Sequence, residues 1–423
     1  MGPEPSIPAP MVAPAADDHG VPAADHRRRP GLGASASEAA AWLSRDTVDS
    51  LPNGDLERKL AGGRQVRVKL GIDPTAPDIH LGFTVVLQKL REFQDLGHRV
   101  VLIIGDYTAR VGDPSGRSTT RPVLEPAEID ANAQTFTDQA LRVLLADPEL
   151  LEVRFNSEWL DMSMSDLFVL LRTANVGQIL ERDDFAKRFA AHEPISVLEL
   201  LYPLLQGYDS VAVRADIELG GTDQKFNLLL GRDVQRAYGQ PEQVIMTLPL
   251  LTGTDGVRKM SKSFGNYIGV TDSPDQMYGR TQSIPDAALP DWYALLLGGL
   301  PDPQLSPRDA KRGLARALVT RFHDAGAAAA AEAQFDRIFG RHELPDDAAV
   351  VTWPANGDLV HLPALLARAF SVSTSEARRG LAQGAVRLDG KPVATGVLDM
   401  PAREIDGRVL QLGKRRFRRV VIA

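Results

Sequence analysis

A continuous apolar run, Val100-Val101-Leu102-Ile103-Ile104, is the feature that most limits the folds open to this chain. A strand that is apolar on both faces is typical of a parallel sheet covered by helices on both sides. Residues 66–70 alternate like a second strand, and residues 81–93 carry apolar side chains at roughly helical spacing between the two. This order predicts a βαβ unit, with ligands at the carboxyl ends of its strands.

Composition narrows the class of protein further. The chain has 423 residues, of which 43% are hydrophobic and 24% charged, as in a globular protein of two to three domains. It has no cysteine, which excludes disulfides, thiolate catalysis and cysteine zinc sites. No apolar run approaches the roughly 20 residues of a membrane-spanning helix. Residues 1–38 are rich in Ala and Pro and lack the apolar core of a signal peptide, so we expect a disordered tail on a cytoplasmic protein.

Charge is unevenly distributed along the chain. The net charge is −7, yet residues 355–423 hold 12 Lys/Arg and 6 Asp/Glu, a net of +6 that leaves −13 for the remainder. The densest basic run, Lys414-Arg415-Arg416-Phe417-Arg418-Arg419, taken alone is equally consistent with a solvated terminal strand. An acidic body with a basic C-terminal module favours contact with a polyanion such as RNA.

Other segments predict the order of elements along the chain. Residues 125–200 have an irregular, mainly helical pattern, which indicates an insertion between two halves of the sheet. Residues 245–251 resemble another buried strand, and helices follow beyond Val270 up to a boundary at Pro345. The last module is expected to contain a helix at 362–370, a helix at 375–383, a strand at 385–388 and an Asp389-Gly390 turn.

The strand at 245–251 leads into a lysine-rich loop, Lys259-Met260-Ser261-Lys262-Ser263, flanked by Gly253, Gly256 and Gly265. Two cations on a mobile strap suit a polyphosphate whose charge must be held while a bond to it breaks. A solvated surface loop is the alternative, and the choice depends on whether other residues complete a nucleotide site.

His80-Leu81-Gly82 opens the helix of the βαβ unit and supplies such residues. A helix N-terminus offers free N–H groups to phosphate, and Gly82 has no side chain to keep a ligand from the backbone. His80 can donate to a phosphate oxygen, and Thr75 adds a hydroxyl. Taken alone, His80 is more simply interpreted as a capping or packing residue. Taken together with the lysine loop, it favours phosphate binding.

Tyr202, Gln206 and Asp209 are spaced so that one helix face presents a hydroxyl, an amide and a carboxylate. These are acceptors that an ammonium group needs, and a buried phenol also needs a partner for its hydroxyl. The alternative is a solvated face of a surface helix. Leu204 and Leu205 lie between the polar residues and indicate packing nearby.

Taken in order, these motifs resemble class I aminoacyl-tRNA synthetases, and more closely the bacterial-type tyrosyl-tRNA synthetases. The similar segments are His80-Leu81-Gly82, Gly112-Asp113-Pro114-Ser115-Gly116-Arg117, Tyr202 to Asp209, Gly220-Gly221-Thr222-Asp223-Gln224 and the lysine loop. The resemblance extends over residues 40–423. It implies that ATP activates L-tyrosine to an adenylate and that tyrosine then passes to the terminal ribose of tRNA(Tyr).

The resemblance also implies the roles of individual residues. The catalytic residues are Thr75, His80, Lys259 and Lys262. Those around ATP are Gly71, Asp73, Gly82, Gly221, Asp223, Ser261 and Ser263. Those around tyrosine are Asp113, Tyr202, Gln206, Asp209 and Gln224. Mg²⁺ accompanies ATP, with no dedicated protein metal site and no tightly bound cofactor.

The implied architecture is a Rossmann-type parallel-sheet α/β catalytic domain at 39–269, with a helical insertion at 125–190 and the lysine loop at 253–267. A helical domain at 270–347 that binds the anticodon region and a small α+β S-four-type RNA-binding domain at 355–423 follow. The resemblance further implies a homodimer, with the insertion at the interface.

Two positions depart from the family pattern. Phe83 stands where the signature normally has a second His, which usually contacts the ATP ribose. Lys69 stands where many relatives have a Tyr against the substrate phenol, and an alternating strand allows Lys69 to point into the pocket or away from it. Three rivals follow: a tryptophanyl relative, a non-catalytic RNA-binding paralogue favoured by Phe83, and a tyrosine-activating enzyme outside translation.

Overall fold

The computed structural model describes residues 30–31, 33–75, 78–114, 126–340, 348–354, 357–413 and 416–423. Contacts divide the chain into one unit of Met1–Ser273 and Arg280–Leu314 and a second of Pro274–Gly279 and Ala315–Ala423. The predicted tail lies outside the described residues up to position 29. Its last residues are helical, because α1 (Ala36–Leu43) begins with a capping box formed by Ser35 and Glu38.

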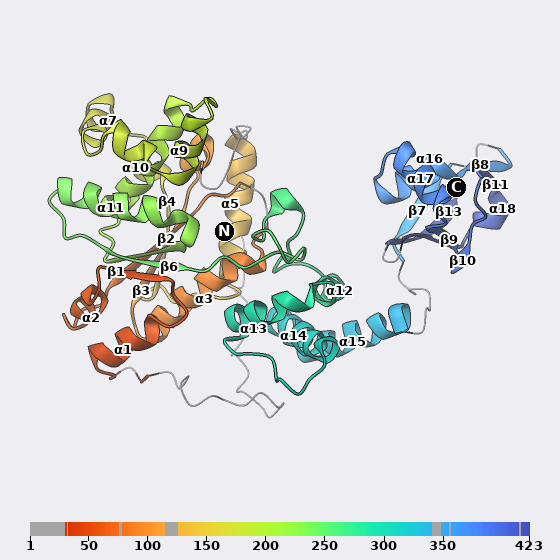
Figure 1. The fold of residues 1–423 in the computed structure, drawn as a ribbon, viewed down its shortest axis with the longest axis horizontal. Coiled ribbons are helices and arrows are strands. Elements are labelled where there is room, and N and C mark those ends of the chain that lie inside the picture. The colour runs from red at the N-terminus through yellow and green to blue at the C-terminus, as the bar shows by residue number, and fades with distance from the viewer. Residues whose placement is uncertain are drawn as a thin grey trace, which may run out of the picture. The chain divides into compact units, whose positions relative to one another are not determined.

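A six-stranded sheet forms the centre of the first unit, in the order β1-β6-β5-β2-β3-β4 (Figure 1). Its strands are β1 (Asp49–Leu51), β2 (Arg67–Ile72), β3 (Arg99–Ile104), β4 (Leu151–Phe155), β5 (Ile217–Gly221) and β6 (Val244–Leu248). β2 and β3 are parallel, with Val68 opposite Val100, and α3 (Leu81–Asp95) connects them, which confirms the predicted βαβ unit. The sheet is mixed rather than wholly parallel, since β1 runs antiparallel to β6.

The segment predicted as a helical insertion contains a strand of the sheet. β4 pairs in parallel with β3, between α5 (Pro126–Ala140) and α6 (Ser157–Leu160). The prediction missed it because Leu151-Glu152-Val153-Arg154-Phe155 is a single short alternating stretch whose strand character depends on pairing with β3. The remaining helices of this segment are α7 (Met164–Leu171), α8 (Val176–Leu180) and α9 (Asp183–Ala190).

Two long helices, α10 (Val197–Ala212) and α11 (Lys225–Ala237), lie side by side in the first unit (Figure 1). α10 begins at a second capping box, in which Ser196 and Glu199 satisfy each other's backbone N–H groups. Close packing requires Gly207 on α10, where a Cβ would lie 2.9 Å from the Val234 side chain of α11. This contact brings the backbone of α10 close to α11.

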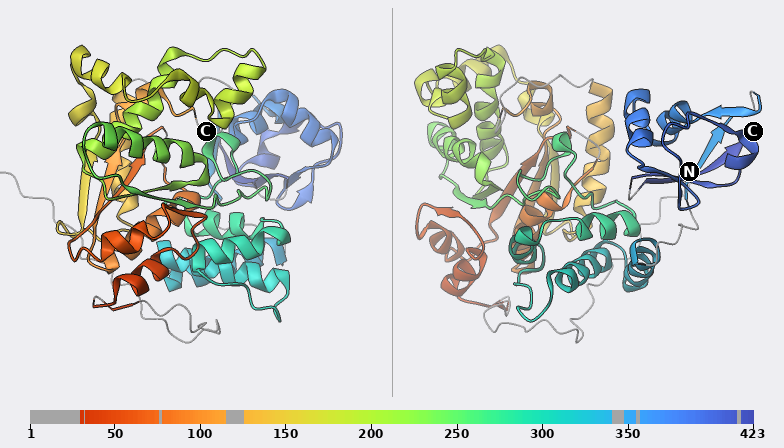
Figure 2. Two further views of the ribbon diagram at one scale, coloured as in Figure 1. Left: turned by 60° about the vertical axis from the view of Figure 1, so that its left-hand side comes forward. Right: turned by 45° about the vertical axis from the view of Figure 1, so that its right-hand side comes forward.

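Further helices follow the sheet in sequence, and Figure 2 shows them from two sides. They are α12 (Pro274–Gln282), α13 (Leu289–Leu297), α14 (Pro307–Phe322) and α15 (Ala325–Phe335), in addition to the early α2 (Asp55–Leu60). Leu314, Leu318 and Phe322 are buried on one face of α14, as their spacing predicts. Among the described residues, no helix has the length and apolarity that crossing a bilayer requires.

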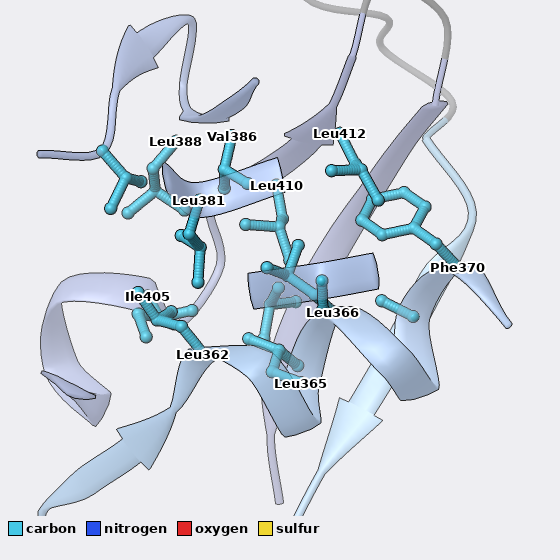
Figure 3. Close-up of a cluster of buried hydrophobic side chains, with 14 of the residues drawn as sticks. Leu362, Leu365, Leu366, Phe370, Leu381, Val386, Leu388, Ile405, Leu410 and Leu412 are labelled. Atoms are coloured by element: carbon cyan, nitrogen blue, oxygen red, sulfur yellow. The ribbon is translucent and has the colours of Figure 1, made fainter. Parts of the chain in front are cut away.

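The C-terminal residues fold around an apolar core of their own (Figure 3). A five-stranded sheet has the order β10-β9-β12-β13-β7, and a two-stranded sheet pairs β11 with β8. The strands and helices are β7 (Val350–Trp353), β8 (Leu359–His361), α16 (Leu362–Phe370), α17 (Thr374–Ala382), β9 (Val386–Leu388), β10 (Lys391–Pro392), β11 (Asp399–Pro401), α18 (Ala402–Ile405), β12 (Val409–Leu412) and β13 (Arg416–Ile422). The predicted order of helix, helix, strand and turn is confirmed, and Asp389 and Gly390 both have positive φ as that turn requires. The predicted boundary at Pro345 lies outside the described residues.

Candidate active site

A cavity of about 510 Å³ opens at the carboxyl ends of β2, β3 and β5, where a parallel sheet was predicted to bind its ligand. It brings together side chains that are more than a hundred residues apart in sequence. Of the predicted site residues, those lining it are Gly71, Asp73, Thr75, His80, Gly82, Asp113, Tyr202, Gln206, Asp209, Gly221, Asp223, Gln224, Lys259, Ser261 and Ser263. Lys262 is the one predicted site residue outside this lining.

His80 lies at the N-terminus of α3, and its Nδ1 accepts a hydrogen bond of 3.2 Å from the Gly82 N–H. Burial, together with repulsion from Lys262 and Lys259, lowers the pKa of His80 to about 3. The ring is therefore neutral near pH 7, and because Nδ1 accepts, Nε2 carries the proton. A Cβ on Gly82 would lie 3.0 Å from the imidazole, so glycine leaves room for this arrangement.

Asn266 forms hydrogen bonds across the lysine loop. Its Oδ1 accepts from the Ser261 N–H at 2.9 Å, and its Nδ2 donates to Asp255 at 3.0 Å. A Cβ on Gly253 would collide with the Asn266 amide, and Gly256 and Gly265 have positive φ. The three flanking glycines thus serve the geometry of this hydrogen-bonded turn.

The two lysines of the loop differ in their surroundings. The Lys259 Nζ lies 2.7 Å from Asp223 Oδ2, and both side chains line the cavity. The Lys262 Nζ instead lies 5.1 Å from the centre of the Phe136 ring on α5, a cation–π contact. Lys259 is therefore the lysine that faces the cavity in this structure.

Asp209 on α10 also lines the cavity; it is buried and accepts a hydrogen bond of 2.8 Å from Trp159 Nε1. Burial raises the pKa of Asp209 to about 6, against the opposing effects of Lys69 and the hydrogen bonds from Trp159 and Asn156. The sequence did not identify Trp159 or Asn156, because no local spacing links them to a helix fifty residues away.

Tyr202 and Asp73 form a second pair within the cavity. The Tyr202 hydroxyl donates to Asp73 Oδ2 at 2.9 Å, and Thr108 Oγ1 donates to Asp73 Oδ1 at 2.7 Å. Burial and the neighbouring carboxylates raise the pKa of Tyr202 well above 10, so the phenol stays neutral. Its oxygen can still accept a hydrogen bond from a cation.

Phe83 and Lys69, the two residues that depart from the family pattern, lie in different places relative to the cavity. Phe83 lines the cavity, with its ring centre 4.6 Å from that of His80 and 6.5 Å from that of Phe136. Lys69 is fully buried away from the cavity lining, and its Nζ lies 2.9 Å from Glu218 Oε1. Phe83 therefore occupies part of the site, whereas Lys69 lies behind its wall, with its Nζ on the cavity-lining Glu218 and 3.0 Å from the backbone oxygen of Gln206.

Comparisons with known proteins identify the family of this chain. The family model described as tRNA synthetases class I (W and Y) matches residues 61–340. The tyrosine–tRNA ligase of Moorella thermoacetica is 51% identical over 395 residues, covering 89% of this chain and 94% of the relative. The tyrosine–tRNA ligase of Thermotoga maritima is 47% identical over 392 residues, covering 89% and 96%.

Among solved structures, tyrosyl-tRNA synthetase from Aeropyrum pernix superposes with a TM-score of 0.58 at 20% identity, covering 73% of this chain and 100% of that one. That similarity supports the fold alone, whereas the family model and the sequence relatives extend to the motifs of the cavity. The chain belongs to the tyrosine–tRNA ligase family of class I tRNA synthetases.

Proposed function

We propose that this protein is a tyrosine–tRNA ligase, which activates L-tyrosine with ATP and transfers it to the 3′-terminal ribose of tRNA(Tyr). The observation that carries the proposal is one cavity lined both by the α3 N-terminus and the lysine loop, which suit phosphate, and by Asp209 and Tyr202, which suit the polar groups of tyrosine. The comparisons support it, because the chain matches tyrosine–tRNA ligases over about nine-tenths of its length.

In the first step, a tyrosine carboxylate oxygen would attack the α-phosphorus of ATP. The bond from that phosphorus to the oxygen bridging to the β-phosphate breaks, and pyrophosphate leaves with the bonding electrons. The carboxylate is already ionised, so no residue must act as a base. Catalysis then depends on positioning and on donors for the developing charge.

The donors we assign to the phosphates are His80 Nε2–H, the Thr75 hydroxyl, the α3 N-terminus at Gly82, and Lys259 and Lys262. Asp223 and Gly221 would contact the ribose, with Gly71, Asp73, Ser261 and Ser263 completing the nucleotide site. Since Lys259 pairs with Asp223, ATP must exchange that contact for a phosphate. The side chains are 35% and 23% exposed, so breaking the pair costs at most about 1 kcal/mol.

For tyrosine, we assign the phenol hydroxyl to Asp209 and the ammonium to Asp113, Tyr202, Gln206 and Gln224. A ligand without the hydroxyl would leave the buried Asp209 carboxylate with only its donors Trp159 and Asn156, which disfavours phenylalanine. Mg²⁺ would enter with the phosphates of ATP. Within the described residues, no group of three His, Cys, Asp or Glu side chains is arranged to hold a metal ion.

Tyrosine affinity is expected to weaken as the pH falls below about 6. The phenol donates to the ionised form of Asp209, whose pKa is about 6, so binding must remove the proton that Asp209 holds at lower pH. The dissociation constant should rise up to about tenfold per pH unit below that value. Calorimetric titration between pH 5 and pH 7.5 measures this. His80 has a pKa of about 3 and therefore does not titrate between pH 5 and pH 7.5. Asp209→Asn should abolish the pH dependence of tyrosine affinity. A pH-independent affinity in the unaltered protein would refute the assignment of the phenol to Asp209.

Phe83→His should lower the KM for ATP or raise turnover by about two- to tenfold, the contribution of one added hydrogen bond. The Phe83 ring lines the cavity beside His80 and cannot itself hydrogen-bond to a ribose. Steady-state kinetics of pyrophosphate exchange with varied ATP measures both constants. Kinetics that do not change would show that position 83 is not used for ATP in this protein.

The C-terminal residues 355–423 are proposed as an S-four-type RNA-binding domain and residues 270–347 as a helical domain that binds the anticodon region. Among the described residues of the C-terminal module, eight basic side chains are exposed: Arg368, Arg378, Arg379, Arg387, Lys391, Arg403, Arg408 and Arg416. Lys414 and Arg415 of the densest basic run lie outside the described residues. Phosphate contacts of this kind release counterions, so affinity for tRNA should fall steeply as salt rises. An affinity that is insensitive to salt would argue against the assignment.

We also propose a cytoplasmic homodimer. Large apolar side chains are exposed on α7 to α10, namely Met164, Phe168, Val169, Val176, Phe189 and Val197. An exposed apolar surface of this kind commonly marks a protein interface. Sedimentation equilibrium should give twice the mass of one chain, and a single-chain mass at micromolar concentration would contradict the proposal.

The proposed function is tested by charging. The protein should attach labelled tyrosine, and not tryptophan or phenylalanine, to tRNA(Tyr) in the presence of ATP. Charging with tryptophan would instead support the tryptophanyl branch of the same family. An enzyme that forms the adenylate yet leaves tRNA uncharged would point to tyrosine activation outside translation.

A further inference from the structure

Asn227 on α11 links two of the glutamines that line the cavity. It is only 1% exposed and is absent from the cavity lining, so it lies behind the wall. Its Nδ2 donates to Gln206 Oε1 and to Gln224 Oε1, both at 3.0 Å. One amide NH₂ group thus uses its two hydrogens on the carbonyl oxygens of two different site residues.

Charged groups at both ends fix the direction of these hydrogen bonds. Arg182 Nη1 lies 3.0 Å from Asn227 Oδ1, and a guanidinium can only donate, so the oxygen of Asn227 faces Arg182 and its NH₂ faces the glutamines. Beyond Gln224, Nε2 of that residue donates to Asp113 Oδ2 at 2.9 Å, and a carboxylate only accepts. Asp113 Oδ1 also lies 3.8 Å from Arg182 Nη2, so the two charged groups close the network. Both ends therefore require the same orientation of the intervening amides.

Hydrogen bonds orient the side-chain amide of Gln206 in the same way. Its Nε2 lies 3.4 Å from Glu218 Oε1, a longer contact, while its Oε1 accepts from Asn227. An amide oxygen has two acceptor positions, and Asn227 fills one on each glutamine. The second is available to a cation in the cavity that Gln206 and Gln224 line.

Arg182 itself is firmly held. It is 5% exposed, and its Nε and Nη2 donate to the two oxygens of Asp184 at 2.8 and 2.9 Å. Its guanidinium carbon also lies 5.0 Å from the centre of the Phe185 ring. A bidentate ion pair with an aromatic contact gives the guanidinium a single geometry, so the donor that orients Asn227 is fixed before any ligand binds.

We propose that Arg182 and Asn227 are positioning residues that make the site selective for a substrate ammonium group. They turn the amide oxygens of Gln206 and Gln224, rather than the NH₂ groups, to accept from it. This inference rests on the proposed function. Neither residue touches the substrate. Without the Asn227 donor, Gln206 keeps only its 3.4 Å contact with Glu218, so its amide can rotate by half a turn and present hydrogens to a cation, which repels it. Gln224 stays held by Asp113 but loses the donor that fixes its oxygen.

The test compares two ligands that differ only in the amino group: L-tyrosine and 3-(4-hydroxyphenyl)propionate. Asn227→Leu has nearly the same shape but lacks both donors. The dissociation constant for tyrosine should rise about 10- to 100-fold, as for a lost hydrogen bond to a charged group. The constant for the analogue should change less than about twofold, since Asp209 still holds its phenol. Calorimetry on the full chain gives both values.

Gln94→Leu is the matched control. Gln94 is a 1% exposed amide on α3 whose bonds go to the backbone of Leu145 and Leu150, away from the cavity. It should lower thermal stability and leave the ratio of the two affinities unchanged. If Asn227→Leu does not fold, Asn227→Ser, too short to reach both glutamines, is judged by the same ratio.

Equal weakening of both ligands by the Asn227 variant would show a structural role and overturn the inference, and so would unchanged binding of both. Failure of the unaltered protein to bind tyrosine is a separate outcome. It would overturn the proposed function, and the inference with it, before any variant is compared.

Discussion

Lys259→Ala is expected to lower the rate of tyrosine-dependent exchange of pyrophosphate into ATP by about 10²- to 10³-fold, the usual cost of removing one donor to transition-state charge. Lys259 is the lysine of the loop that faces the cavity, and Lys262 lies over Phe136. The substitution leaves the Asn266 hydrogen bonds that hold the loop in place, so the loss should reflect the missing ammonium. Exchange kinetics at saturating tyrosine measure it.

Arg258→Ala is the control for that experiment. Arg258 precedes Lys259 in the loop, but its guanidinium pairs with Asp255 at 3.1 Å and it does not line the cavity. It should retain exchange within about threefold, the scale of a weak surface ion pair. If Lys259→Ala were no slower than Arg258→Ala, the cavity-facing lysine would have no catalytic role.

His80→Ala is expected to slow exchange by a similar factor of about 10²–10³ while leaving tyrosine affinity unchanged. The neutral imidazole carries its proton on Nε2, which we assign to the phosphates, whereas Asp209 is assigned to the phenol of tyrosine. Alanine also removes the cap on α3, so unfolding should become easier by about 0.5–2 kcal/mol. Thermal denaturation and tyrosine titration separate these two effects.

His80→Asn distinguishes capping from catalysis. Asparagine is a favourable N-cap and should restore the stability of α3, but its side chain is too short to reach a phosphate as imidazole does. We therefore expect thermal stability near that of the unaltered protein, with exchange as slow as in His80→Ala. Recovery of exchange in His80→Asn would mean that His80 acts only as a cap.

The parts of the fold that follow from local pattern were predictable. The run at 100–104 is apolar on both faces and became β3, and the periodic residues 81–93 became α3. β1 and β4 were missed because each is short and exists through pairing at a sheet edge. A three- or five-residue segment carries too little periodicity to be distinguished from a loop.

The site was predictable where residues lie within a motif and unpredictable where they meet through space. The spacing of Tyr202, Gln206 and Asp209 placed them on one face of α10, and all three line the cavity. The contact of Lys259 with Asp223 and the burial of Lys69 against Glu218 depend on how the loop and strands pack. No feature of the sequence near Lys69 indicates which side of β2 it occupies.

Asn227 is a further residue whose role could not be predicted from the sequence. Three residues after Gln224, it would be taken from the sequence alone as an ordinary helical residue. Its importance in this account comes from Arg182 and Gln206, which approach it from two other segments. Hydrogen-bond direction across such a network depends on the charged groups at its ends, and these become visible once the chain is folded.

The central claim is that the cavity activates tyrosine, and the most direct test is exchange of labelled pyrophosphate into ATP with each of several amino acids. We predict exchange with tyrosine that exceeds exchange with phenylalanine or tryptophan, and that requires Lys259. A correctly folded protein that shows no tyrosine-dependent exchange would contradict the account and favour a scaffold that binds RNA without catalysis.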